Sequence, residues 1–147
     1  MKNQLRETPR EACLINVRGK GVGVRFSGKW GKGDLAGWYV GVHRRNGRGR
    51  YSLALQDTTG GHCDGEPCGS LPLEWVVKHG QFGAFLNGST NVLECNMEVL
   101  KKFAFRHRVN DVELVWVPIR VTSDFSDAEG IWPYNHAAAA GRNRQVE

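Results

Sequence analysis

The sequence predicts a mainly β fold with short helices, and two features of its composition support this. Nineteen glycines are spread over 147 residues, which indicates many turns and close backbone approaches, as in a loop-rich β fold rather than a helical bundle. Between them lie short runs rich in β-branched and aromatic residues, such as 35–42 and 112–121, a composition typical of strands. No repeat or linker divides the chain, so we expect one domain.

The first half of the chain is expected to form short strands joined by glycine-rich turns. The Asn46-Gly47 pair is a hairpin signal, and the alternating pattern after it predicts another strand. We expect strands at 12–17, 24–26, 35–42 and 51–55, and turns at 18–23 and 29–34.

A short helix is predicted over residues 70–80, between two loops. Ser70 can cap this helix, Pro72 suits its first turn, and Gly80 can end it. The segments on either side, 57–70 and 87–95, are polar or glycine-rich and predict loops.

The last third of the chain predicts a long hairpin. Two extended runs, 97–106 and 112–121, are separated by a turn at Val109-Asn110-Asp111. Residues 122–130 predict a loop, and 131–134 predict a last ordered segment before the tail.

The overall composition favours a globular protein inside a cell, in the nucleus or the cytoplasm. Hydrophobic residues make up 40% of the chain and the net charge is +5. The first residues lack the apolar core of a signal peptide, and no apolar run reaches the ~18 residues of a membrane span. In a reducing compartment the four cysteines are expected to be free thiols. The His62-Cys63-x4-Cys68 spacing is not that of a structural zinc site, so we expect no metal.

Several segments, in chain order, resemble the motifs of the SET-domain family of protein lysine methyltransferases. Residues 20–24 and 32–35 are similar to the family's G-x-G-V/L and K-G-[DET] turns, and residues 38–41 are similar to its E-Y-x-G strand end. Residues 80–89 are similar to its G-N-x-x-R-F-I-N-H-S motif, 97–121 to the two strands after that motif, and 132–135 to its closing [FY]-D-Y-[GN].

Four departures from the family pattern bear on activity more than on fold. Gly88 stands where the family has the histidine of N-H-S, and Ala84 stands where it has an arginine. The loop toward Glu94-Cys95-Asn96 is longer than the corresponding family loop. The usual G-E-E is absent, and residues 126–130 stand in its place.

The resemblance implies a SET-like β-clip with a knot-like C-terminal segment. The domain would span residues 12–136, between an N-terminal extension at 1–11 and a tail at 137–147. In such a fold, residues 122–136 would lie against the 82–91 segment, an arrangement that is rare among proteins.

By the same resemblance, the protein would transfer a methyl group from S-adenosylmethionine to a lysine side chain of a protein or peptide, with histone tails as the usual substrates. The implied cofactor-binding residues are Lys20, Gly21, Val22, Gly23, Asn87 and Gly88. The implied catalytic residues are Tyr134, which would orient the amine, together with Tyr39 and Trp132.

The chemistry of the reaction suits these residue types. The lysine amine, with a reference pKa of about 10.4, must lose its proton, and a narrow apolar channel disfavours its charged form. Aromatic rings such as Trp132, Tyr39 and Phe85 would attract the ammonium. Lys20 or Arg25 would face the cofactor carboxylate. The bulk of Trp132 would narrow the pocket, so we expect monomethylation.

Other functions remain open at this point. The departures from the family pattern also fit a catalytically inactive SET-like module that only binds a partner. The basic segment 44–50, next to strands with aromatic residues, also fits a small nucleic-acid-binding β domain. The glycine turns also fit an unrelated β-rich domain. If the substrate is basic, a local acidic groove is needed, formed by Asp57, Asp64, Glu66, Glu94 and Glu98.

Overall fold

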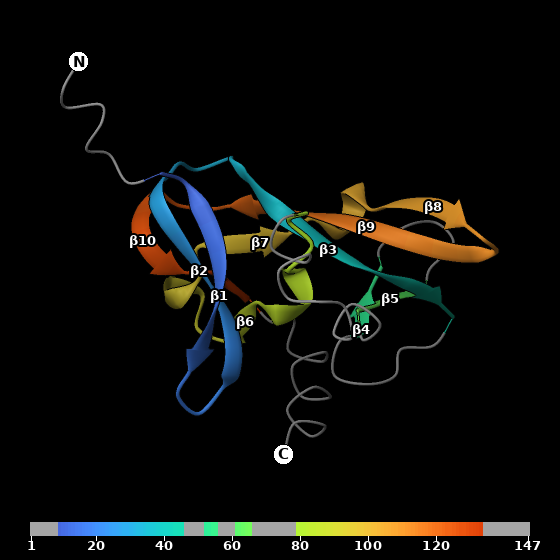
Figure 1. The fold of residues 1–147 in the computed structure, drawn as a ribbon, viewed down its shortest axis with the longest axis horizontal. Helices are drawn as coiled ribbons and strands as arrows, with labels where there is room; N and C mark the ends of the chain where they lie inside the picture. Colours follow the sequence, from blue (N-terminus) through green and yellow to red (C-terminus); the bar gives the residue numbers. More distant parts are fainter. Residues whose placement is uncertain (1–8, 46–51, 56–60, 66–78, 134–147) are drawn as a thin grey trace.

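The computed structural model describes residues 9–45, 52–55, 61–65 and 79–133, and within them the mainly β fold is confirmed (Figure 1). The strands are β1 (Glu11–Val17), β2 (Gly21–Trp30), β3 (Leu35–Arg44), β4 (Ser52–Ala54), β5 (His62–Asp64), β6 (Asn87–Ser89), β7 (Met97–Val99), β8 (Phe105–Val109), β9 (Val112–Val121), β10 (Phe125–Glu129) and β11 (Ile131–Pro133). The helices in the described residues are single 3-10 turns, η3 (Gly83–Phe85), η4 (Val92–Glu94) and η5 (Lys101–Phe103).

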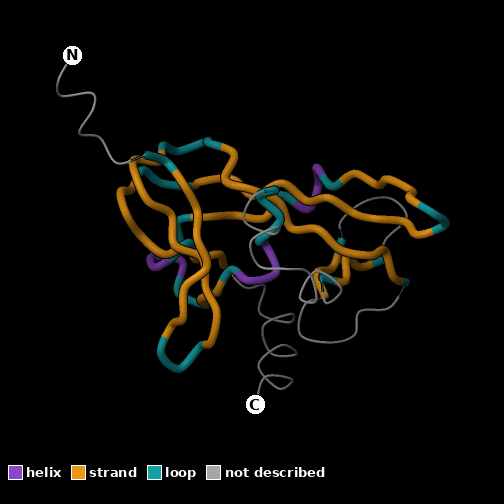
Figure 2. Tube along the Cα trace, in the orientation of Figure 1, coloured by secondary structure: helices purple, strands orange, loops and turns teal. Residues whose placement is uncertain are grey.

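The strands form two larger sheets and one short ladder. The first sheet has the antiparallel order β1-β2-β10. The second has the order β4-β5-β3-β9-β7, and β8 also pairs with β9. Between them, β11 pairs with β6 in parallel. The tube in Figure 2 shows that strands dominate the described chain and that the helical turns are short.

The central strand β9 has one buried face and one partly exposed face. Its alternate residues Val115, Val117, Ile119 and Val121 are all fully buried, whereas the residues between them are not. This period of two is the pattern of a strand with one face in the core. In the other sheet Phe26 is also fully buried, and its ring makes edge contacts with the rings of Trp30, Phe82 and Phe125.

The strands predicted at 12–17, 35–42 and 112–121 are present; the last matches β9 at both ends, and the first two differ from β1 and β3 by at most two residues at one end. The predicted turn at 109–111 joins β8 to β9, and both Asn110 and Asp111 have positive φ, as such a hairpin turn requires. The run at 97–106 is two strands rather than one, because η5 interrupts it. The predicted helix lies mostly outside the described residues.

Three predicted loops were wrong, because each contains a strand: β5 within 57–70, β6 within 87–95 and β10 within 122–130. These strands are short and polar, so their sequences lack the alternation that marks a half-buried strand. In β10 the side chain of Asp127 also contributes, since its Oδ1 accepts a hydrogen bond of 2.8 Å from the amide of Gly28 where the ladder with β2 is irregular. Tertiary pairing, rather than local propensity, forms these strands.

The alanine substitution Gly41→Ala should destabilise the fold by about 1–3 kcal/mol, the usual cost of overpacking a core. A Cβ at this position would overlap the carbonyl of Asp64 on the neighbouring strand and lie 2.9 Å from the Cys63 sulfur. Urea denaturation of both proteins measures the difference.

The matched control is Gly31→Ala, since a Cβ there would come no closer than 3.6 Å to any neighbour. Equal stability losses in the two variants would contradict the close β3–β5 packing.

Candidate functional site

The parallel pairing of β11 with β6 joins two segments that are far apart in the sequence. Ile131 is opposite Asn87, Trp132 is opposite Gly88, and Pro133 is opposite Ser89. This confirms, for the described residues, the expectation that the C-terminal segment lies against the 82–91 segment. In Figure 1 the pair lies beside the sheet of β1, β2 and β10.

Asn96 fastens β11 in place with both its side chain and its main chain. Its Nδ2 donates to the Glu129 carbonyl at 3.0 Å, and its Oδ1 accepts from the Ile131 amide at 2.8 Å. Its main-chain amide donates to the Ile131 carbonyl, and its carbonyl accepts from the Thr122 amide. One asparagine therefore fixes the chain on both sides of Gly130.

Three residues from three different strands meet next to this junction. The Asn87 amide donates to the Glu129 carboxylate, with Nδ2 and Oε2 2.7 Å apart. A Cβ added to Gly23 would lie 2.6 Å from Glu129 Oε2 and 2.7 Å from Asn87 Nδ2. The glycine in β2 thus leaves the space that the Asn87–Glu129 pair occupies. Arg25 is opposite Glu129 in the β2–β10 ladder. The site therefore contains one positively charged and one negatively charged side chain.

The remaining predicted cofactor-binding residues differ in how far they are exposed to solvent. Lys20, Gly21 and Val22 are exposed where the β1–β2 turn enters β2. Gly21 has a φ of +80°, a conformation that favours glycine, and a Cβ there would meet no atom within 4 Å. Gly88 is half-buried in β6. The structure therefore brings Gly23 into contact with Asn87 and leaves the turn residues open to solvent.

Two of the three predicted catalytic aromatic residues, Tyr39 and Trp132, are buried in the core. Tyr39 is 2% exposed and Trp132 is 5% exposed, and both belong to the same hydrophobic cluster. Gly65 lies beside the Tyr39 ring, since a Cβ there would be 3.3 Å from the hydroxyl oxygen. Tyr134 lies outside the described residues, as do Asp57 and Glu66 of the suggested acidic groove.

The other acidic residues of that groove are already engaged. Asp64 pairs with Arg44, and Glu98 pairs with Arg120. Glu94 accepts a hydrogen bond of 2.6 Å from the Ser89 hydroxyl. They come from β5, β7 and η4, so the described residues give the groove no support.

Cys95, close to β6, is a half-buried free thiol. Burial raises the pKa of Cys95 above its ordinary value, and the nearby Glu94 carboxylate raises it further. The three described cysteines, Cys13, Cys63 and Cys95, are free thiols, as predicted, and Cys68 lies outside the described part of the chain. A group of three metal-ligating side chains is not found in residues 9–45, 52–55, 61–65 and 79–133.

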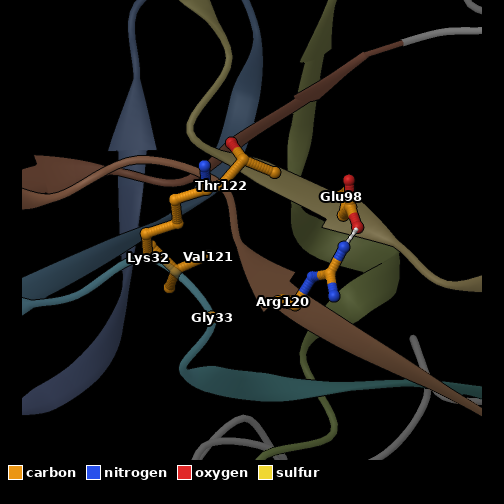
Figure 3. Close-up of a pocket in the computed structure, with 6 residues that line it drawn as sticks. All are labelled: Lys32, Gly33, Glu98, Arg120, Val121 and Thr122. Atoms are coloured by element: carbon orange, nitrogen blue, oxygen red, sulfur yellow. Dashed lines mark hydrogen bonds and ion pairs between the residues drawn. The ribbon is translucent and has the colours of Figure 1, made fainter.

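A surface hollow of about 220 Å³ lies elsewhere, between the turn after β2 and the strands β7 and β9. Figure 3 shows the Lys32 side chain extending toward Thr122, and Glu98 paired with Arg120 on the other side. Its lining contains Glu98 of the suggested acidic groove but none of the predicted cofactor-binding or catalytic residues. Because its carboxylate is paired and no further titratable acid lines it, the Gly23–Asn87–Glu129 group is the better candidate site.

Glu129 and Asn96 are the two site residues that sequence reasoning missed. Both lie in segments that depart from the family pattern, Glu129 where the usual G-E-E is absent and Asn96 at the end of the longer loop. Glu129 was assigned to the predicted loop 122–130, and Asn96 lay between the predicted loop 87–95 and the predicted strand 97–106. Their roles appear only when β10 and β11 are placed.

Comparisons with known proteins bear on the fold. No model of a known protein family matches the chain, and no curated protein matches it. Among solved structures it is similar to one from Plasmodium falciparum described as a "putative histone methyltransferase". The two share 16% sequence identity with a TM-score of 0.52, over 87% of this chain and 96% of the other. At this identity the similarity concerns the fold alone.

We expect Asn96→Ala to cost about 1–3 kcal/mol, because it leaves the Ile131 amide and the Glu129 carbonyl without their side-chain partner. Chemical denaturation gives the free energy, and hydrogen exchange at Ile131 reports the local loosening.

The control is Asn16→Ala, on the exposed side of β1, where substitutions usually change stability by less than about 0.5 kcal/mol. If Asn96→Ala were as harmless as this control, Asn96 would not fasten β11.

Proposed function

We propose that the protein is an S-adenosylmethionine-dependent methyltransferase that acts on lysine side chains of proteins, with histone tails among the candidate substrates. The observation that supports this most is the meeting of Gly23, Asn87 and Glu129 at the β6–β11 junction. Gly23 and Asn87 belong to two segments, 20–24 and 80–89, that resemble SET-domain motifs, and Glu129 belongs to the segment that stands in place of the family's G-E-E. The fold similarity to the Plasmodium protein agrees with the proposal.

The described residues fit the chemistry of this cofactor. Its amino-acid end carries an ammonium and a carboxylate, and the site offers Glu129 and Arg25 opposite each other on neighbouring strands. Among the described strands β6 pairs with β11 alone, so its other edge leaves main-chain groups of Asn87 and Gly88 for a ligand. The exposed turn at Lys20, Gly21 and Val22 borders the same site.

When bound, the cofactor supplies an electrophilic methyl group on a sulfonium. Gly23, Asn87, Glu129 and Arg25 would hold the cofactor, and the lysine amine that receives the methyl group would lose its proton to solvent. The chain's own contribution is positioning and desolvation. Tyr39 and Trp132 would provide apolar, electron-rich walls that lower the pKa of the amine and attract its cation.

The finer assignments are part of the same proposal. Tyr134 would orient the lysine amine, and Trp132 would restrict the product to monomethyl-lysine. The protein would work inside the cell, in the nucleus or the cytoplasm. Within the described residues no helix is long and apolar enough to cross a membrane.

Adding S-adenosylmethionine should raise the melting temperature of the protein. A ligand at about 100 times its dissociation constant adds roughly 2.7 kcal/mol if it binds only the native state. We expect Glu129→Gln and Asn87→Ala to reduce the shift, because they remove the carboxylate charge and its hydrogen-bond donor. Differential scanning fluorimetry with and without the ligand measures this.

The control Lys29→Gln removes an exposed charge from β2 and should retain the full shift. With binding established, mass spectrometry of peptides incubated with Tyr134→Phe and the parent protein tests turnover. Binding without turnover would favour an inactive module, and no shift in the parent protein would contradict the proposal.

A further inference from the structure

A second surface, at the opposite end of the molecule from the candidate site, has the composition of a nucleic-acid interface. It is formed by η5 and the β8–β9 hairpin, which projects away from the sheet of β1, β2 and β10 (Figure 1). The segment 101–108 reads Lys-Lys-Phe-Ala-Phe-Arg-His-Arg, with four cations and no acidic residue. We call this segment with the aromatic residues of β9 and β3 beside it the hairpin surface.

Aromatic rings are unusually exposed on the hairpin surface. Phe103 is 68% exposed and Phe105 is 49% exposed. The Phe105 ring is parallel to the Trp116 ring, with 4° between their planes, and the Trp38 ring packs edge-on against both. The Trp116 and Trp38 rings therefore hold the Phe105 ring in place, and the rest of that ring remains exposed to solvent. Fixed, exposed rings are what nucleobases stack on.

Positive charge lies at both ends of this aromatic group. Lys101 and Lys102 precede the aromatic residues along the chain, and the Lys102 side chain is exposed. At the other end, β3 and β8 both flank the start of β9, as their registers with Leu114 and Val112 show. This places the exposed residues Arg45 and Arg108 on either side of it.

Acidic residues offset only part of this charge. Glu113 pairs with Arg106 and Arg108, and Asp64 pairs with Arg44. Arg108 is still 63% exposed in its side chain, so its remaining donors can reach a phosphate. The chain as a whole carries a net charge of +5. A polyanion is the partner that this distribution attracts.

We propose that the hairpin surface binds single-stranded nucleic acid, with bases stacked on Phe103 and Phe105 and phosphates contacted by Lys102, Arg45 and Arg108. A single strand fits better than a duplex because only its bases present their faces for stacking. This moves the nucleic-acid contact expected at 44–50 toward the hairpin. Residues 46–50 lie outside the described part of the chain.

The test is fluorescence anisotropy of a labelled single-stranded oligonucleotide of about 16 nucleotides. Phe103→Ala should weaken binding roughly 5- to 150-fold, the usual loss for one stacking residue, and Phe103→Tyr should retain it. A plot of log affinity against log salt concentration has a negative slope, and Lys102→Gln should make that slope shallower by about 0.7, the value for one phosphate contact on a single strand.

Two controls lie outside the hairpin surface. Leu93→Ala removes another exposed apolar side chain and should leave affinity unchanged, and Lys29→Gln should leave the salt slope unchanged. Phe103→Ala should also keep the thermal shift with S-adenosylmethionine, so the two sites are tested separately.

Absence of binding would overturn the proposal, as would equal affinity of Phe103→Ala and the parent protein. Tighter binding to a duplex of the same sequence, or binding to vesicles of anionic lipid in place of the oligonucleotide, would also overturn it.

Discussion

The parallel ladder between β6 and β11 is the contact on which the candidate site depends. It is short, only three residues on each strand, and would be weak in isolation. Asn96 compensates by bonding the chain before and after Gly130, and Gly130 itself donates to the Val24 carbonyl at 2.8 Å. These bonds join β2, β10 and β11, and the ladder joins β11 to β6, so the three strands that supply the site are fixed relative to each other.

This constraint gives several small features a common reason. Gly23 has no side chain because the Asn87–Glu129 pair occupies the space beside it. Gly130 is similarly enclosed, since a Cβ there would lie 2.5 Å from the Phe26 ring. A carboxylate and an amide can therefore be held half-buried at a crossing of strands, at the edge of the aromatic core around Phe26. Such preorganised polar groups beside an apolar core are what binding a charged ligand requires.

The sequence predicted the long strands well, because runs such as 112–121 have the period of two that burial on one face imposes. Through family resemblance rather than local pattern, it also assigned Asn87 and Gly23 to one predicted cofactor site, and in the structure these two residues lie close together. It did not predict β5, β6 or β10, since a three-residue ladder or a polar edge strand leaves almost no periodic signal. Glu129 and Asn96 were missed for that reason, as their contacts span 42 and 33 residues of sequence.

The direct test of the account is to map amide chemical shifts by NMR while S-adenosylmethionine is added. The proposed site predicts that the perturbed amides cluster at Gly23, Asn87, Gly88 and Glu129, from three strands that only the folded chain brings together. The amides of the β8–β9 hairpin should stay unchanged. Perturbations confined to the hairpin, or none at saturating ligand, would contradict the assignment of the β6–β11 junction as a cofactor site.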